Sequence, residues 1–539
     1  MKKTKKFLLA VLSILTAGFC LFGATGCDFL SGDDSKKSEY SQTDDSEEES
    51  ETETDTEDAE ESETDDSEEE NEVDESIDTE EETDKYSVGL TYKLSEDNYN
   101  YVVKRIGTCK DTDIVIPEKY KGLPVVGIGT YAFTDCSNIT SITIPDSILS
   151  MGDYAFSGCD NLTSVYYMGN IKGWCNIRGL STLMANDVDL YIENELVAGE
   201  LIIPDGITNI RNCAFYYCDE LTSVIIPDSV MNIGEWSFKN CIGLMNVVIP
   251  DSVKSIGYMA FYDCCNLTTI AMTESVTSVG GYAFYNTGYY NNENNWENGV
   301  LYLDGWLLHT KIDIVSGDYI VKEGTKGIAG DAFSDCNELL SVIIPDSVTS
   351  IGDGAFEDCS KLTSITLPDN ITVISWGLFW DCSSLTSVTI PDNITDIKAY
   401  AFYGCCRLKN ITIPDSVITI GESAFSWCEY LKSVSIGKNV ASIGDSAFEC
   451  CFSLTSITIP DSVTSIGDSA FETCHRLTDV TIGNGTICIG EEAFSYCSKL
   501  TSITFNGTVE EWNAVEKGTD WNYCVPATKV VCTDGEVAL

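Results

Sequence analysis

The sequence contains little histidine and little positive charge, and both shortages narrow the functions that it can have. Only His309 and His475 occur among 539 residues, so histidine-based acid–base catalysis, catalytic triads and zinc sites are not expected. Lysine and arginine number 31 against 86 aspartates and glutamates, which gives a formal net charge of −55. Such a chain repels nucleic-acid phosphates and anionic membrane surfaces, so neither is expected as a partner.

Metal-binding spacings are missing as well. The 24 cysteines include no C-x-x-C pair, and the acidic residues show no EF-hand spacing. We therefore expect no metal site, no cofactor and no enzymatic activity.

The first 85 residues differ in composition from the rest of the chain. Four lysines precede an apolar run over 7–22, and Ala24-Thr25-Gly26-Cys27 follows, which resembles a bacterial lipoprotein signal. The resemblance implies that residues 1–26 are removed and that Cys27 is acylated; an ordinary cleaved signal or an uncleaved anchor helix are the alternatives. Residues 27–85 consist mostly of Ser, Thr, Glu and Asp, so they are predicted to be a disordered acidic stalk.

The remainder is organised by a 23-residue repeat, seen most clearly from Leu454 to Arg476 and beginning L-T-S-I-T-I-P-D-S-V-T-S-I-G-D-S-A-F-E. A fixed period of this size predicts a solenoid whose turns bury their apolar sides against their neighbours. L-x-x-I-x-I alternates as a strand with Leu and both Ile inward, and Pro-Asp-Ser ends it in a turn. Val, Ile and Ala-Phe fill the core from the opposite side. The glycine after Ile is expected to meet a positive φ or a close-packing demand.

The Ala-Phe pair recurs once in each repeat, and we call its phenylalanine the landmark phenylalanine. It marks about 14 coils between residues 111 and 505. A hairpin cap is expected at 86–110 and a second cap at 506–539. The unit L-x-x-I-x-I-P-D-S-V-x-x-I-G-x-x-A-F-x-x-C resembles the leucine-rich repeat of the BspA-like bacterial surface protein family. The resemblance implies a mainly β leucine-rich-repeat solenoid, display on the bacterial surface, and adhesion to host matrix proteins or other cells. It implies no catalytic residues.

Two variant units interrupt the period, near residues 166–203 and 285–328. The first shares G-x-[IV]-x-x-W-x-x-[IV] and a following hairpin pattern with the C-terminal cap, so the two are expected to be the same unit. The second contains Asp304-Gly305 between apolar runs, which is a strong hairpin signal. Tyr290 and Trp296 in its polar loop could recognise a sugar or a peptide; alternatively, Trp296 and Trp306 fill the gap between two repeat blocks.

Thirteen of the 14 landmark phenylalanines are followed by Cys three residues later. Stacked coils place these thiols in a ladder, but parallel side chains do not present the disulfide dihedral, so buried free thiols are predicted. For Cys524 and Cys532 in the terminal cap, a disulfide and two free thiols both remain open.

The outward strand positions distinguish early coils from late ones. One position that holds Thr or Ser in the late coils is apolar earlier in the chain, at Tyr166, Ile225, Val248, Ala271 and Ile343. Contiguous exposed apolar surface is typical of an interaction site. The alternative is the ordinary preference of branched residues for strands.

Together these features predict an exported, monomeric protein that is lipid-anchored at the bacterial cell surface and contacts the membrane only through that anchor. The favoured function is adhesion or protein–protein interaction with an extracellular protein or glycan. Two alternatives remain: a carbohydrate-binding surface lipoprotein that uses Tyr290 and Trp296, and a structural envelope protein without a dedicated ligand.

Overall fold

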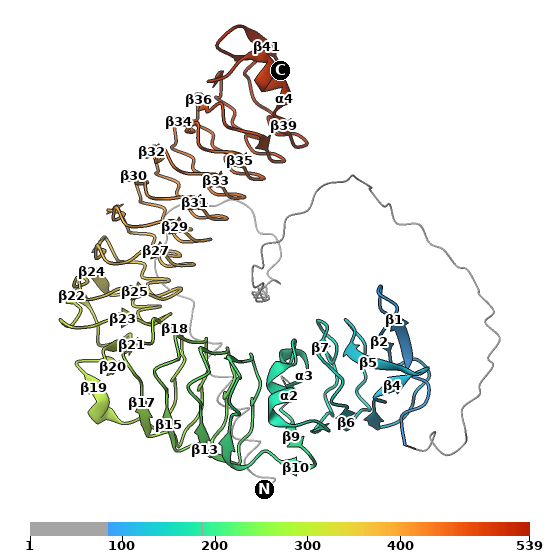
Figure 1. Cartoon of the computed structure of the whole chain (residues 1–539). Helices are drawn as coiled ribbons and strands as arrows, with labels where there is room; N and C mark the ends of the chain where they lie inside the picture. The colour runs from blue at the N-terminus through green and yellow to red at the C-terminus, as the bar shows by residue number, and fades with distance from the viewer. Residues whose placement is uncertain (1–84, 185–186) are drawn as a thin grey trace, which may run out of the picture. The chain divides into compact units, whose positions relative to one another are not determined.

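The structure is a computed structural model that describes residues 85–184 and 187–539. The predicted signal, Cys27 and the stalk up to residue 84 lie outside the described residues. The described chain winds as a β-solenoid of about 19 turns with about 4% helix (Figure 1). The prediction of a mainly β leucine-rich-repeat solenoid is confirmed. The turns exceed the predicted 14 coils because variant units and caps complete turns without an Ala-Phe landmark.

Each regular coil contains a first strand, which corresponds to the L-x-x-I-x-I segment. Successive first strands pair in parallel and in register, for example Ser456↔Asp479 and Ile457↔Val480. We call the surface of these strands the strand face. Its strands are β3 (Asp113–Val115), β6 (Ser141–Ile144), β8 (Ser164–Tyr167), β9 (Asp189–Ile192), β11 (Gly199–Ile202), β13 (Leu221–Ile225), β15 (Asn246–Val248), β17 (Thr269–Ala271), β22 (Gly317–Ile320), β24 (Leu339–Ile343), β26 (Ser364–Thr366), β28 (Ser387–Val388), β30 (Asn410–Thr412), β32 (Ser433–Ser435), β34 (Ser456–Thr458), β36 (Asp479–Ile482), β38 (Ser502–Phe505) and β40 (Lys529–Val531).

The return side of the coil was expected from the sequence to be less regular, but it also contains strands. Most contain only two residues, so no alternating pattern reveals them, but they build parallel sheets of their own. They are β5 (Leu123–Ile128), β7 (Ser150–Met151), β12 (Asn209–Ile210), β14 (Asn232–Ile233), β16 (Ser255–Ile256), β18 (Ser278–Val279), β21 (Trp306–Thr310), β23 (Gly327–Ile328), β25 (Ser350–Ile351), β27 (Val373–Ile374), β29 (Asp396–Ile397), β31 (Thr419–Ile420), β33 (Ser442–Ile443), β35 (Ser465–Ile466), β37 (Cys488–Ile489) and β39 (Glu516–Lys517). Figure 1 shows the two sets on opposite sides of the late coils.

The core contains the inward residues that the repeat predicts. In the coil of β34, Leu454, Ile459, Val463 and Phe471 are each 0% exposed. Rings of successive landmark phenylalanines stack with centroids 5.0–5.8 Å apart. We call this column the phenylalanine ladder. It is interrupted at each variant unit, and Trp521 ends it edge-on against Phe494.

The glycine after the second-strand isoleucine is required by coil stacking rather than by a positive φ. A Cβ on Gly257 would lie 2.5 Å from the backbone nitrogen of Glu235 in the preceding coil, closer than non-bonded atoms allow. Arg211, Ala329, Ser375 and Lys398 stand at this position in four coils, so the backbone can widen locally.

We expect Gly257→Ala to lower the free energy of unfolding by about 1–3 kcal/mol, the usual effect of overpacking. Gly127→Ala is the matched control, because its new Cβ would lie 3.4 Å from the carbonyl oxygen of Ser150, an ordinary contact. Urea unfolding of both variants measures the difference. Equal urea midpoints for Gly257→Ala and Gly127→Ala would show that close packing between neighbouring coils does not require a glycine at position 257.

The first variant unit and the C-terminal cap have the same local structure. Helix α2 (Ile171–Asn176) is capped by Asn170 and α4 (Val509–Ala514) by Thr508, and each buries one tryptophan. Trp174 contacts Tyr167 at 5.4 Å, and Trp512 contacts Phe505 at 5.3 Å. Each helix is followed by an antiparallel hairpin, β9 with β10 (Glu195–Leu196) and β40 with β41 (Glu536–Ala538). The internal unit also contains α3 (Ser181–Met184).

At its other end the stack begins with the hairpin of β1 (Thr91–Leu94) and β2 (Tyr101–Arg105). β2 then pairs in parallel with β5, which in turn pairs with β4 (Lys119–Tyr120). The segment predicted as the N-terminal cap therefore covers the first coil of the described chain.

The second variant unit contains the predicted hairpin at Asp304-Gly305, where both residues have positive φ. Its strands are β19 (Trp296–Glu297), β20 (Val300–Leu303) and β21, preceded by the short 3-10 helix η1 (Glu293–Asn295). Both of its faces are buried: Val300 and Leu307 join the core that follows, while Leu301 and Leu308 join the core that precedes. The hairpin therefore connects two blocks of the solenoid.

Candidate binding surfaces

The strand face exposes a row of apolar side chains over four neighbouring strands, β11, β13, β15 and β17. Ile202 and Ile225 are paired across β11 and β13, and Val248 and Ala271 across β15 and β17. Ile202 is 55% exposed, Ile225 48% and Val248 62%, and Ala271 is exposed as well. We call these four residues the apolar stripe. Its inward neighbours are buried, so the exposure follows from strand alternation.

Ile343 belongs to a second group, which lies after the Asp304-Gly305 hairpin in the chain. It is 51% exposed and pairs with Ile320, which is 69% exposed, and with Thr366 on its other side. Tyr166 belongs to a third group, where it is only half-buried because it stacks on Tyr191 at 4.6 Å. The single row expected from the sequence is therefore three separate groups.

Ile202, Tyr191 and Ile320 were missed by the sequence analysis because they lie in variant units that lack the leading Leu-x-Ser pattern. Gly199-Glu200-Leu201-Ile202 and Gly317-Asp318-Tyr319-Ile320 share a pattern, and alignment of these two segments would have revealed both isoleucines. Each segment opens a new sheet on the strand face.

Tyr290 and Trp296 pack onto the hairpin of the second variant unit. Both are half-buried, the Trp296 Nε1 donates to the Tyr290 carbonyl at 2.7 Å, and Lys311 Nζ lies 4.5 Å from the Trp296 ring centroid. Trp306 is 2% exposed. The cavity beside Tyr290 and His309 measures about 10 Å³, room for a single water and far too small for a sugar ring. The geometry favours the gap-filling interpretation. Burial lowers the pKa of His309 to about 4.

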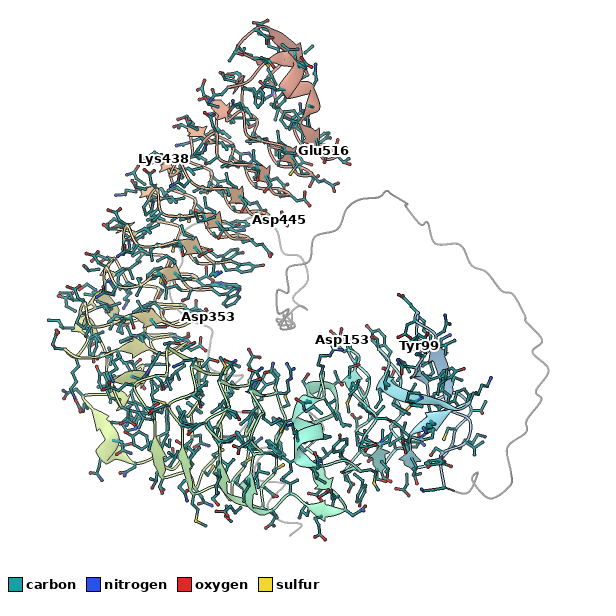
Figure 2. The ribbon with its side chains drawn as sticks, in the orientation of Figure 1. Tyr99, Asp153, Asp353, Lys438, Asp445 and Glu516 are labelled. Atoms are coloured by element: carbon teal, nitrogen blue, oxygen red, sulfur yellow. The ribbon has the colours of Figure 1, made fainter. Side chains whose placement is uncertain are left out.

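A second surface lies at the turns that carry the landmark phenylalanines, which we call the turn edge. The residues two before and two after each phenylalanine have positive φ, even where they are bulky, as at Tyr131 (58°), Trp236 (54°) and Trp427 (59°). Aromatic rings gather here: Tyr131 stacks on Tyr154 at 5.4 Å. Figure 2 labels Asp445 at this edge and Lys438 of the same coil at the opposite one.

This surface was not predicted from the sequence. Its signal was available, because tyrosine and tryptophan recur immediately around Ala-Phe, as in Trp376, Trp380, Tyr400 and Tyr403. These four rings come from two adjacent coils and contact one another with centroids 5.0–5.9 Å apart. We call them the aromatic platform.

Carboxylates crowd the turn edge beside this platform. Burial raises the pKa of Asp331 to about 7, with further contributions from Glu357, Asp353 and Asp335. Burial and then Asp358 raise the pKa of Glu357 to about 7 as well.

We expect Asp331→Asn with Glu357→Gln to increase stability at pH 7.5 and to leave it unchanged at pH 4. Both carboxyls have folded-state pKa values of about 7, above their ordinary values near 4. Between about pH 4 and 7 the folded chain therefore binds more protons than the unfolded chain. The stability of the folded state falls as the pH rises through this range, because the two carboxyls must then ionise in the folded state. The gain is on the order of 1 kcal/mol, since both groups keep some contact with water. Urea midpoints at pH 4, 5.5 and 7.5 measure it. A constant difference across this range would contradict the titration.

The repeats also match a family model. The BspA-type leucine-rich repeat region, in 6 copies, covers residues 107–175, 194–299, 318–428 and 395–515. The chain belongs to the BspA-type leucine-rich repeat family. Members are typically bacterial surface proteins, and solenoids of this type are typically non-enzymatic.

Solved structures of similar proteins come from several bacteria. A leucine-rich cell surface protein of Faecalibacterium prausnitzii is 25% identical, with 80% of this chain and 96% of that one covered and a TM-score of 0.30. A leucine-rich repeat protein of Bacteroides ovatus is 21% identical, with 82% of this chain and 98% of that one covered and a TM-score of 0.29. The pneumococcal vaccine antigen PcpA is 18% identical, with 74% of this chain and 92% of that one covered and a TM-score of 0.26. At these TM-scores the structures do not inform the arrangement of this BspA-type chain. No curated protein matches it.

The cysteines of the BspA-type repeat form a ladder of free, buried thiols, as predicted. Ten of the thirteen thiols donate to the carbonyl of the landmark phenylalanine in the preceding coil, for example Cys428 to Phe402 and Cys474 to Phe448, both at 3.3 Å. Burial raises the pKa of Cys428 well above its ordinary value, so this thiol stays protonated and unreactive.

The suspected disulfide of the terminal cap is not formed. Cys524 and Cys532 are both free; Cys524 is exposed on the last turn, at a positive φ, and Cys532 is buried in the terminal hairpin. The two cysteines therefore lie in different environments of the cap.

Residues 85–184 and 187–539 contain no cluster of three or more His, Cys, Asp or Glu side chains that could hold a metal ion. Nor does any helix in this part of the chain have the length and apolarity to cross a membrane.

Proposed function

We propose that this protein is an anchored surface adhesin or interaction module that binds an extracellular protein through the apolar stripe. The observation that carries the proposal is the register of Ile202, Ile225, Val248 and Ala271 on four adjacent strands. The equivalent positions in late coils hold exposed hydroxyls such as Thr412 and Thr458, so the repeat does not require apolar residues there. Exposed apolar surface with a polar rim is typical of protein interaction sites.

A purely structural envelope role predicts no such departure from the repeat. Carbohydrate recognition through Tyr290 and Trp296 is disfavoured, because both rings pack on the hairpin and Lys311 covers Trp296.

The proposal is tested by immobilising the purified protein and probing it with matrix proteins, mucins and partner cells. Saturable binding that soluble protein competes away supports it. Absence of binding to every probe contradicts it and favours the structural role.

The anchor is proposed to be the acylated Cys27. We expect Cys27→Ala to move the protein from the membrane fraction to the soluble fraction, because several acyl chains on one residue give stable attachment and their loss removes it. Cys20→Ala is the control and should remain in the membrane fraction. Fractionation of expressing cells followed by immunoblotting measures the distribution, and an unchanged distribution for Cys27→Ala would rule out this anchor.

A further inference from the structure

A row of carboxylates runs beside the apolar stripe, on the turns that follow its four strands. In each coil an exposed acidic residue stands three positions after the stripe residue. The four are Asp205, Asp228, Asp251 and Glu274, and we call them the acidic row. These turns stack as the strands do, because Ser229 Oγ accepts at 3.0 Å from the backbone N–H of Gly206 in the preceding coil. The row therefore follows the stripe from its first coil to its last.

The late coils have acidic turns without the apolar neighbours. Asp369 and Asp392 are exposed at the same repeat position, but the residues three before them are the exposed hydroxyls of Thr366 and Thr389. An acidic turn is thus a general feature of this repeat. What distinguishes the four coils from β11 to β17 is a continuous apolar surface with carboxylates along one side of it.

The chain already places its own ammonium groups against this position of the repeat. In a late coil, Lys438 Nζ lies 2.6 Å from Asp415 Oδ2, and the Lys438 backbone N–H donates to Asp415 Oδ1 at 3.0 Å. Figure 2 shows Lys438 at the edge opposite the turn edge. In the last coil of the stripe, Lys326 Nζ lies 3.1 Å from Glu274 Oε1. A carboxylate at this position can therefore hold a cation.

The middle of the row, beside Ile225 and Val248, differs from its ends. Lys172 Nζ approaches Gly206 near the first end, and Lys326 reaches the last. Asp228 and Asp251 lie between them and form no ion pair with any residue of 85–184 and 187–539. Carboxylates on adjacent coils, about 4.8 Å apart, repel each other. A cation from a partner would relieve this repulsion.

An open groove borders the last coils of the row. It measures about 850 Å³, and Asp251, Met272, Glu274, Asp304 and Lys326 are among the residues that line it. Asp304 Oδ2 accepts from the Met272 backbone N–H at 2.8 Å, which fixes the hairpin tip beside the stripe. With three carboxylates and one ammonium group, the groove has room and net negative charge for a further cationic side chain.

The spacing of the stripe selects the secondary structure of the segment that covers it. The stripe advances by one side chain per coil, about 4.8 Å, so its four residues cover about 14 Å. An α-helix that lies along it presents one ridge of apolar residues with one turn every 5.4 Å or so, which is about the same step. An extended strand presents same-face residues about 6.8 Å apart and loses register within two coils. The pair Ile320 and Ile343 covers only two coils, too short for such a ridge.

We propose that the apolar stripe and the acidic row together bind an amphipathic cationic helix of the partner protein. The apolar face of that helix covers the stripe, and lysines or arginines along one flank pair with Asp228 and Asp251. A further cation at its end enters the groove beside Asp304. This inference rests on the proposed function, because it uses the same stripe, and it specifies the chemistry of the partner.

The first test uses the full-length purified protein and the peptide acetyl-Leu-Lys-Lys-Leu-Leu-Lys-Leu-Leu-Lys-Lys-Leu-Leu-Lys-Leu-amide, whose leucines have helical spacing. Calorimetry is done at 150 mM salt, where the Debye length is about 8 Å and diffuse attraction to the acidic chain is screened. Asp228→Asn with Asp251→Asn is expected to weaken binding about tenfold. Asp369→Asn with Asp392→Asn removes the same charge from the same repeat position in late coils and should change the affinity less than twofold.

A second test concerns the helical period and the stripe. The peptide acetyl-(Leu-Lys)7-amide has the same length, but its leucines alternate as in a strand, so it should bind about tenfold more weakly. Because the described chain has only about 4% helix, circular dichroism of the mixture reports helix gained by the first peptide on binding. Ile225→Thr with Val248→Thr installs the late-coil residue and should remove both the gain and most of the affinity. Urea midpoints show that each variant is folded.

The outcomes decide the inference separately from the proposed function. Absence of peptide binding, equal affinity for the two peptides, or equal loss in the two pairs of aspartate variants overturns the cationic helix. The partner found in the binding screen gives the second readout. If its affinity falls in Ile225→Asp with Val248→Asp but not in Asp228→Asn with Asp251→Asn, the adhesive stripe is retained and only the cationic helix is overturned. If neither pair matters, both proposals are overturned.

Discussion

Ile225→Asp with Val248→Asp is expected to abolish binding of the protein to its extracellular partner while leaving the circular dichroism spectrum unchanged. Both side chains lie in the middle of the apolar stripe and point away from the core, at 48% and 62% exposure. Burying each against a partner would contribute about 1.5–3 kcal/mol, and the introduced carboxylates would have to be desolvated. The affinity should therefore fall by about 100-fold or more.

Thr412→Asp with Thr458→Asp is the matched control for this variant. These threonines are exposed on the same strand face, so the control introduces the same charges at the same repeat position in other coils. Surface plasmon resonance with the partner found in the binding screen measures both. Wild-type affinity in the Ile225/Val248 variant would place the adhesive site elsewhere, and equal loss in both variants would indicate general electrostatic repulsion.

Phe425→Ala is expected to lower stability by about 3–5 kcal/mol, the usual loss for a large aromatic side chain removed from a core. Phe425 is 0% exposed and stacks on Phe402 at 5.0 Å and on Phe448 at 5.2 Å. Since a solenoid is held only by contacts between neighbouring coils, the damage should be concentrated at this point in the stack. Urea unfolding measures the loss, and hydrogen exchange should show faster opening in the two adjoining coils.

Trp427→Ala is the control, because this ring is in the same coil but is 41% exposed. Its removal should change stability by less than about 1 kcal/mol. Uniform loss of protection along the whole stack in Phe425→Ala would show that the solenoid unfolds as one unit instead of locally.

The two candidate surfaces occur at positions of the repeat where the residue type varies most from coil to coil. The apolar stripe and the aromatic platform both use outward positions, at which side chains are free to vary because neither stacking nor core packing selects them. The inward positions recur almost unchanged, from Phe133 to Phe494, since each must match the coil above and the coil below.

Some features could not be predicted for identifiable reasons. The two-residue strands such as β35 are too short to show an alternating pattern. The separation of Tyr166, Ile225 and Ile343 into three groups depends on how the variant units divide the sheets. The contact of Trp380 with Tyr400 requires knowledge of which turn residues face the neighbouring coil.

By itself, the sequence determined the solenoid, its strand face and the free-thiol ladder, because a strict period repeats the same local choices at Leu454, Ile457 and Phe471. Tertiary structure alone decided which outward residues become neighbours. Stacking of the coils places Ile202 next to Ile225 and Trp380 next to Tyr400. The physical reason is that inward residues are specified by burial within each coil, whereas a binding surface exists only after coils have been stacked.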